Sequence, residues 1–185
     1  MRMRKTACLS LSLLAGVLAG VWMTGGVPAA AAGPLSGYTL GRSTGYPIPR
    51  FVSLKSKKAR MRVGPSTNYS ILWIYQRAGT PLEIIGEWGN WRRVRDDAGT
   101  SGWMHAALLS GRRTAVVAPW LKTNVPLVRG PARASGEIAR MQPGVLLDIR
   151  GCDGSWCRVA TRRQAIGGYV AQDKLWGVYP GEAIE

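Results

Sequence analysis

The stretch that decides the fold occurs twice in this chain, as GEWGNWRRV from Gly86 to Val94 and as GCDGSWCRV from Gly151 to Val159. Five of the nine positions are identical in the two copies. The second copy alone contains cysteines, Cys152 and Cys157. A phrase repeated at this spacing predicts a structural unit that is present twice.

Further matching segments flank this phrase in the same order in both halves of the chain, each at nearly the same offset. They pair MRVGPS (61–66) with LVRGPA (127–132), GTPLEI (79–84) with GVLLDI (144–149), SGWM (101–104) with GGYV (167–170), and ALL (107–109) with DKL (173–175). Chance would not preserve both the order and the offset. The unit therefore comprises about 60 residues and is repeated once.

Each unit is expected to consist of short strands. The runs FVSLK, ARMRV, ILWIY, PLEIIGEW, WRRVR and SGWMH are rich in β-forming residues, and turn signals containing Gly, Asn, Asp or Pro separate them. The Gly-Asn pair between the two tryptophan-bearing runs predicts a tight hairpin turn. Five or six strands in a unit of this size are too few for two full sheets. The sequence therefore predicts an all-β chain with two small, partly open barrels, over residues 51–112 and 119–180.

The segment 1–32 has the three parts of a secretory signal peptide: basic MRMRK, an apolar run from Cys8 to Met23, and small residues before a cleavage site near Ala31 or Ala32. The alternative is an uncleaved membrane anchor, although the run is shorter than the ~20 apolar residues of a spanning helix. No later stretch is long and apolar enough to span a membrane. Export to the periplasm or the exterior is therefore expected. The segment 33–50, rich in Gly, Pro and Ser, predicts a flexible arm.

The chain is strongly basic, with 25 Lys and Arg against 10 Asp and Glu and a formal net charge of +15. Signal cleavage removes only Arg2, Arg4 and Lys5 from this excess. A positive field attracts wall polymers, acidic lipids or nucleic acid, and it does not determine the fold. Export argues against nucleic acid. A solvated basic surface without any partner is the alternative interpretation.

The cysteines predict one disulfide. Cys8 leaves with the signal, so the mature chain carries Cys152 and Cys157 in an oxidising compartment. A hairpin can place two such side chains opposite each other, and closing so short a loop contributes about 2 kcal/mol of chain entropy. In the first copy, Glu87 and Arg92 occupy the equivalent positions, where they predict a cross-strand ion pair.

No enzyme class finds its residues in this chain. His105 is the only histidine, so it alone would have to serve a Cys or Ser nucleophile, and no G-x-S-x-G motif is present. One histidine with Cys152 and Cys157 is too few for a zinc site. Asp96 and Asp97 belong to a predicted DDAG turn and not to a pair of glycosidase acids. We therefore expect no catalytic residue, no metal and no cofactor, and we interpret His105 as a surface residue.

Three groups of residues resemble a known family. In the first copy they are Arg62, Gly64, Pro65, Ser66, Thr67 and Tyr69, then Gly89, Trp91 and Val94, and finally Gly102 and Trp103; the second copy keeps Gly130, Pro131, Trp156, Val159 and Tyr169 but lacks the Ser-Thr pair. This combination is similar to the bacterial SH3 domains, small exported barrels that often occur in tandem. The tail LWGVYPGE from Leu175 to Glu182 resembles periplasmic tandem members of the same group. The resemblance implies a non-catalytic binding or scaffolding module of the cell envelope.

Seven tryptophans follow the signal, and those of the first copy are expected to form a shallow aromatic groove for an extended peptide or a glycan. The candidate contact residues are Tyr69, Trp73, Tyr75, Trp88, Trp91 and Arg93. Strand periodicity places Trp91 and Arg93 on the face opposite Val94, so Trp91 faces outward if Val94 points into the barrel. The alternative is that these aromatics only cover the poor core of a small barrel.

These observations predict a binding module that recognises a ligand of the cell envelope, either peptidoglycan or another envelope protein, and acts as a monomer or a weak oligomer. Two alternatives stay open. One is a structural adaptor whose barrels bind no small ligand. The other is a salt-sensitive binder of polyanions or acidic lipids.

Overall fold

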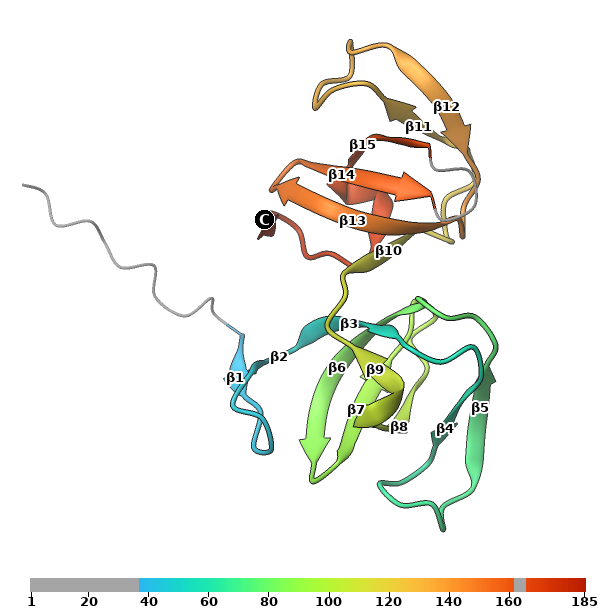
Figure 1. Cartoon of the computed structure of the whole chain (residues 1–185), viewed down its shortest axis with the longest axis vertical. Helices are drawn as coiled ribbons and strands as arrows, with labels where there is room; N and C mark the ends of the chain where they lie inside the picture. The colour runs from blue at the N-terminus through green and yellow to red at the C-terminus, as the bar shows by residue number, and fades with distance from the viewer. Residues whose placement is uncertain (1–36, 162–165) are drawn as a thin grey trace, which may run out of the picture. The chain divides into compact units, whose positions relative to one another are not determined.

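Each copy of the repeat folds into its own curled antiparallel sheet (Figure 1). The computed structural model describes residues 37–161 and 166–185, so the expected signal peptide lies outside the described residues. The chain is all-β apart from two single-turn 3₁₀ helices, Ala106–Leu108 and Gln172–Lys174, within these described ranges. The predicted fold class is confirmed.

The first sheet has the strand order β5-β4-β8-β7-β6-β3-β9. Its strands are β3 (Arg50–Leu54), β4 (Ala59–Arg62), β5 (Ile71–Tyr75), β6 (Pro81–Trp88), β7 (Trp91–Arg95), β8 (Ser101–His105) and β9 (Leu109–Ser110). Each of the six runs picked out by composition forms one of these strands. The last strand, β9, returns to pair with β3, while β5 lies at the other end of the order with one neighbour.

The second sheet repeats this order as β12-β11-β15-β14-β13-β10-β16. Its strands are β10 (Thr114–Val117), β11 (Val125–Val128), β12 (Glu137–Met141), β13 (Leu146–Asp153), β14 (Trp156–Thr161), β15 (Gly167–Ala171) and β16 (Leu175–Trp176). One additional strand, β17 (Ala183–Ile184), pairs with β13. This sheet starts before the expected residue 119 and ends after residue 180, because β10 and the C-terminal strand belong to it.

Alternation along the strands fills each barrel. In β7, Arg92 and Val94 are buried while Arg93 and Arg95 are exposed, and Val94 is fully inaccessible beside Met61 and Met104 in the first core. The second core has the same construction, with Leu127, Leu147, Val159 and Val170 inaccessible or nearly so. The predicted orientation of β7 is therefore confirmed, with Val94 inside and Trp91 on the outer face.

The repeated phrase forms the same hairpin in both barrels. In the first, Trp88 pairs with Trp91 and Glu87 with Arg92 across the Gly89-Asn90 turn, where Gly89 has φ 50°. A positive φ at this place is what a tight hairpin turn requires. In the second barrel, β13 and β14 pair in the corresponding register.

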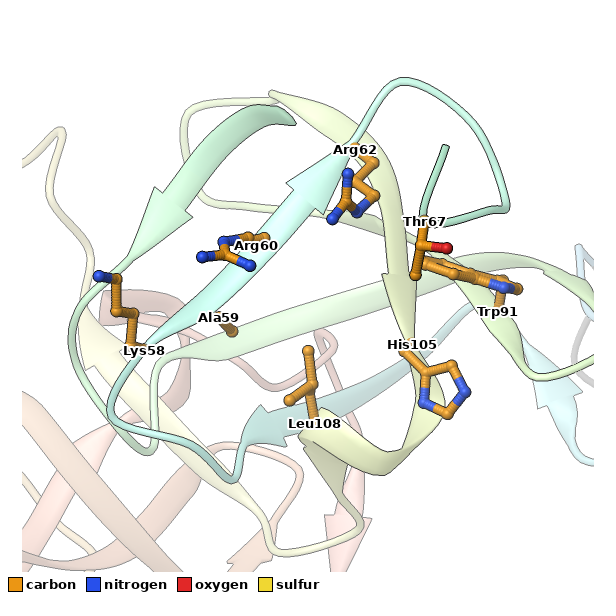
Figure 2. Close-up of a pocket in the computed structure, with 8 residues that line it drawn as sticks. All are labelled: Lys58, Ala59, Arg60, Arg62, Thr67, Trp91, His105 and Leu108. Carbon is orange, nitrogen blue, oxygen red and sulfur yellow. The ribbon is translucent and has the colours of Figure 1, made fainter. Parts of the chain in front are cut away.

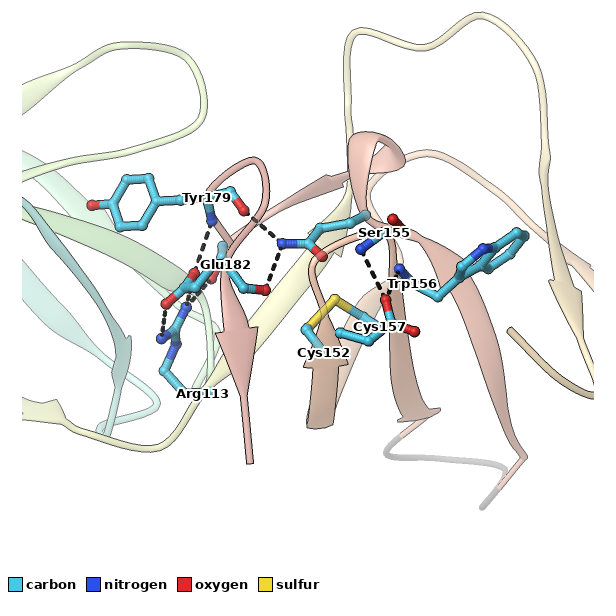
Figure 3. Close-up of a disulfide and its surroundings, with 10 residues drawn as sticks. Arg113, Cys152, Ser155, Trp156, Cys157, Tyr179 and Glu182 are labelled. Atoms are coloured by element: carbon cyan, nitrogen blue, oxygen red, sulfur yellow. Dashed lines mark hydrogen bonds and ion pairs between the residues drawn. A yellow bond between two sulfur atoms is a disulfide. The ribbon is translucent and has the colours of Figure 1, made fainter. Parts of the chain in front are cut away.

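The cysteines lie at the Glu87 and Arg92 positions of the second hairpin and form the predicted disulfide, with Cα atoms 4.1 Å apart (Figure 3). Cys157 is inaccessible and Cys152 is 8% exposed, and both belong to the hydrophobic core. Cys152 also pairs with Ile184 of β17. The bridge joins the two strands of one hairpin, as expected, and it also lies in the barrel core beside the C-terminal strand.

The arm before the first barrel is more structured than its composition indicated. From residue 37 onward it contains the strands β1 (Thr39–Leu40) and β2 (Pro47–Ile48), which pair with each other. Glu87 accepts hydrogen bonds from the backbone of Ser43 and Thr44 and from the Thr44 hydroxyl. A Cβ atom on Gly41 would overlap the Glu87 carboxylate, so only glycine fits there. Specific hydrogen bonding to a buried carboxylate therefore orders a segment that composition alone marked as flexible.

The C-terminal tail is held on the second barrel by polar contacts. Arg113 donates to both carboxylate oxygens of Glu182, at 2.7 and 3.0 Å (Figure 3). The Gln172 amide nitrogen donates to the backbone carbonyls of Tyr179 and Glu182. These contacts fix the loop that precedes β17.

Aromatic residues of both barrels meet at this tail. The Phe51 ring lies 5.1 Å from the Trp176 ring and 4.7 Å from the Tyr179 ring, measured between centroids. The Tyr179 hydroxyl donates to Glu83 at 3.0 Å. Burial of this phenol, together with the negative charge of Glu83, raises the pKa of Tyr179 well above its ordinary value. The hydroxyl therefore stays protonated and remains a donor at physiological pH.

Candidate functional site

The outer face of the first barrel carries a shallow pocket of about 380 Å³ beside Trp91 (Figure 2). Trp91 is the first residue of β7, and its partner across to β8 is His105. Residues from the β4 segment and the loop after it complete the lining. The lining residues are Lys58, Ala59, Arg60, Arg62, Thr67, Trp91, His105 and Leu108.

Three cations line this pocket, and no carboxylate does. Figure 2 shows Lys58, Arg60 and Arg62 following one another along β4 and the residue before it. Arg62 donates to the backbone carbonyl of Tyr69 at 2.6 Å. None of the three forms an ion pair within residues 37–161 and 166–185. The pocket therefore presents positive charge available to a ligand.

His105 positions Trp91 in this pocket. The two rings meet edge to face, with centroids 5.5 Å apart. The Nδ1 atom of His105 accepts a hydrogen bond from the Ala107 backbone at 3.3 Å, which caps the 3₁₀ turn after β8. His105 therefore packs against the Trp91 ring and leaves Nε2 as a second polar nitrogen in the pocket wall.

The structure does not gather the other candidate residues into one groove with Trp91. Trp88, Trp73 and Tyr69 are strongly exposed, at 64%, 57% and 48%, but none of them lines the Trp91 pocket. Arg93 is exposed and pairs across the sheet with Trp103. These side chains stay candidate contacts, distributed over the outer surface.

Tyr75 was wrongly placed among the candidates. It is 8% exposed, belongs to the core, and donates its hydroxyl to Asp96 at 2.8 Å. Burial and this hydrogen bond raise the pKa of Tyr75 well above its ordinary value. The ILWIY run ends with an inward residue because Tyr75 pairs with buried Ala59, so no ligand reaches it.

A larger cleft of about 700 Å³ lies at the equivalent place of the second barrel, and Phe51 and Arg95 of the first barrel also line it. Trp156 takes the position of Trp91, and Arg133 that of Thr67. The cross-strand partner of Trp156 is Ala171, whereas the partner of Trp91 is His105. Trp156 therefore has no aromatic partner at this position of the neighbouring strand. Trp120, Trp176 and Tyr179 also line the cleft.

Counting aromatics by copy led us to expect the ligand site in the first barrel alone. Trp120 and the tail are absent from the repeated phrase, and only folding brings them beside Trp156. The signal that could have found this cleft is the repetition itself. A tryptophan kept at the same place in both copies predicts the same surface position twice.

The described residues contain no cluster of three or more His, Cys, Asp or Glu that could hold a metal ion. They also contain no helix long and apolar enough to cross a membrane.

The family model for the bacterial SH3 domain matches this chain twice, over residues 55–111 and 122–177, which together make up more than half of its length. The chain therefore belongs to the bacterial SH3 domain family, and each match covers one barrel. Membership supports a binding module related to the cell wall. No curated protein sequence matches the chain.

Two solved structures show a weaker likeness. The first is NlpC2 from Trichomonas vaginalis, at 15% identity and a TM-score of 0.30, covering 71% of this chain and 49% of that one. The second is NlpC1 from the same organism, at 15% identity and a TM-score of 0.31, covering 74% of this chain and 48% of that one. The chain spans about half the length of either structure. TM-scores this low carry no argument about this chain.

Proposed function

We propose that this chain is an exported, non-catalytic module that binds a ligand of the cell envelope, and that the pocket beside Trp91 makes the main contact. Two barrels of a family linked to cell walls support this proposal. The single observation that carries it furthest is the composition of the pocket, a half-exposed tryptophan beside three cations without a carboxylate.

This composition indicates the class of ligand. A flat indole face contacts apolar surface, while Arg and Lys side chains bind carboxylates or phosphates. Trp and Arg are also the residue types most enriched at binding hot spots. The ligand is therefore an anionic envelope component with an apolar or planar part, such as the carboxylate-bearing peptide of peptidoglycan.

A protein ligand from the envelope is the second candidate, and strand β5 favours it. This edge strand exposes Ile71, Leu72, Trp73 and Ile74, at 45, 44, 57 and 39%. An exposed apolar edge can pair with an added strand from a partner. The counterpart strand β12 exposes only Ile138 among large hydrophobic residues.

The test is binding of the purified mature protein to peptidoglycan sacculi, with Trp91→Ala compared with the unchanged chain. Loss of a hot-spot contact should weaken binding by about 1–3 kcal/mol, or roughly 5- to 150-fold. Because Trp91 lies on the outer face, the melting temperature of the variant should change little. The matched control is Tyr46→Ala, which removes a more exposed aromatic side chain of the arm that does not line the pocket.

The outcomes separate the alternatives. A Trp91→Ala variant that melts far below the parent would make Trp91 a core residue, with a cost of roughly 3–5 kcal/mol. Binding that disappears between about 50 and 200 mM salt and is equally strong in Trp91→Ala at low salt would identify a polyanion binder. Unchanged sacculus binding in Trp91→Ala would remove the pocket from the proposal.

Export is tested on the native protein. An N-terminus near Gly33 in the soluble periplasmic or secreted fraction is the expected result. An intact N-terminus in the membrane fraction would replace the signal peptide by an anchor.

A further inference from the structure

The cleft beside Trp156 is lined by a continuous series of aromatic rings. Trp120 lies 6.3 Å from Trp176, Trp176 lies 5.1 Å from Phe51, and Phe51 lies 4.7 Å from Tyr179, measured between ring centroids. Trp120 is 58% exposed although it follows a buried strand. Aromatic rings that pack against one another at such distances form a continuous platform with broad apolar surface for a ligand.

Two polar atoms of residues that line this cleft have no hydrogen-bond partner within the described parts of the chain. They are the Oε1 atom of Gln172 and the Nε1 atom of Trp176, both shielded from solvent. Gln172 is 5% exposed, and its amide nitrogen is already used by the tail. A buried polar atom without a partner destabilises the folded protein, and most such atoms in native proteins have a partner. The cleft therefore has one unpaired acceptor and one unpaired donor on side chains that border it.

The charge of the cleft is nearly balanced, unlike that of the Trp91 pocket. Its charged lining residues are Arg95, Arg133 and Asp173. Arg95 is already paired with Glu83, and Asp173 with Lys174. Within the described residues Arg133 alone of the three has no ion pair, so an anionic ligand finds one free cation here against three in the Trp91 pocket.

These properties select among the ligands that aromatic clefts bind. A polyproline segment has flat apolar faces, but its prolines have no N–H to offer the Gln172 acceptor. A sugar ring also has a flat apolar face, and its hydroxyl groups both donate and accept. Of these two ligands, only the sugar can both donate to the Gln172 oxygen and accept from the Trp176 nitrogen.

We propose that the cleft formed by Trp120, Trp156, Trp176 and Tyr179 is a second binding site, which takes a neutral glycan chain. Sugar rings stack on the exposed Trp120 face and on Trp156. Hydroxyl groups pair with Gln172 and with the Trp176 indole nitrogen, after a small turn of these two side chains opens them to the ligand. This site does not depend on the Trp91 pocket, because its lining residues and its ligand chemistry are different.

The experiment uses the mature protein and a soluble tetrasaccharide of β-1,4-linked N-acetylglucosamine, with binding followed by NMR of the tryptophan indole N–H signals. The expected result is a saturable shift of the Trp120, Trp156 and Trp176 signals while the Trp73 and Trp88 signals stay in place. Trp120→Ala should raise the dissociation constant at least about tenfold, since it removes an exposed platform ring without touching the core. Tyr46→Ala is the matched control, because it removes a strongly exposed aromatic ring that does not line the cleft, and it should leave the dissociation constant unchanged.

A second probe and a second variant keep the result decisive. Decaproline is titrated in parallel, and tighter binding of decaproline than of the tetrasaccharide would make the cleft a peptide site and overturn the proposal. Trp91→Ala should keep tetrasaccharide binding intact, so failure of the Trp91 pocket and failure of this site are distinguishable. Absence of indole shifts at millimolar tetrasaccharide, or equal affinity of Trp120→Ala and the parent, would also overturn it.

Discussion

The two barrels close the same hairpin with different chemistry. In the first, the Glu87 side chain is fully buried and lies 3.5 Å from Arg92 and 2.7 Å from Arg50. In the second, Cys152 and Cys157 occupy the same two positions and are bonded covalently. The backbone register is equivalent, so the fold tolerates either solution.

The difference is related to the terminal segment that each hairpin contacts. Glu87 also accepts hydrogen bonds from Ser43 and Thr44, so the ion pair of the first barrel fastens the N-terminal arm. Cys152 pairs with Ile184, so the disulfide of the second barrel lies against the C-terminal strand. Each terminal segment thus covers the hairpin of its own barrel, by polar contacts in one case and by strand pairing against an apolar core in the other.

The largest effect is expected from removing the disulfide. Cys152→Ser combined with Cys157→Ser should lower the free energy of unfolding by about 3–5 kcal/mol. The unfolded chain gains conformational entropy when the bridge is absent, and two hydroxyl groups are buried in the core. Denaturant unfolding measures this, and the second barrel should unfold first. A loss below about 2 kcal/mol would mean that the bridge stabilises through chain entropy alone.

A glycine at the start of the C-terminal tail provides a second test of the second barrel. Gly177 has φ 121°, and a Cβ there would overlap the Thr114 carbonyl oxygen, so Gly177→Ala should cost about 3 kcal/mol or more. Gly111 is the repeat equivalent and has open space around it, so Gly111→Ala is the matched control with little expected loss. Thermal unfolding of both variants is the measurement. Similar melting temperatures would show that the tail has room to shift.

The arm of the first barrel provides the next test. Glu87→Gln leaves Arg50 and Arg92 without their carboxylate and should cost about 2 kcal/mol, the usual value for hydrogen bonds to a charged group. Hydrogen exchange at the Ser43 and Thr44 amides should accelerate, since both donate to Glu87. Glu137→Gln removes an exposed surface ion pair with Arg140 instead and should change the stability little. If the exchange rates in Glu87→Gln are unchanged, the order of the arm does not depend on this carboxylate.

The smallest effect is a dependence of the arm on pH. Burial raises the pKa of Glu87, but hydrogen bonds from Arg50, Thr44 and Ser43 outweigh it and hold this pKa below its usual range. The ionised carboxylate therefore stabilises the folded arm above the unfolded pKa of about 4.3, and this stabilisation is lost as the pH falls toward the folded pKa. Exchange of the Thr44 amide measured from neutral pH down to acid, corrected for intrinsic rates, should show protection lost at the acid end. The Glu87→Gln variant should lack this dependence.

Much of the fold could be predicted from the repeat. Residue type and spacing along the chain determine the strand runs, the hairpin turn and the offset of the two phrases. The two barrels, the inward Val94 and the disulfide could therefore be predicted from the sequence. Tyr75 was misplaced because its burial depends on which neighbour strand it faces. The order in the arm was missed because Gly, Pro and Ser composition does not reveal a partner as distant along the chain as Glu87.

The sequence by itself determined the architecture and the outward position of Trp91, because the first follows from a repeat that can be read directly and the second from alternation along one strand. Only the tertiary structure decided which side chains share a surface. It separated Trp73 and Trp88 from the Trp91 pocket and joined Arg60 and Arg62 to it. It also brought Trp120 next to Trp176, residues far apart in sequence. A binding surface consists of strands and loops that are brought together by long-range pairing. Residue spacing along one strand does not predict which distant segments become its neighbours.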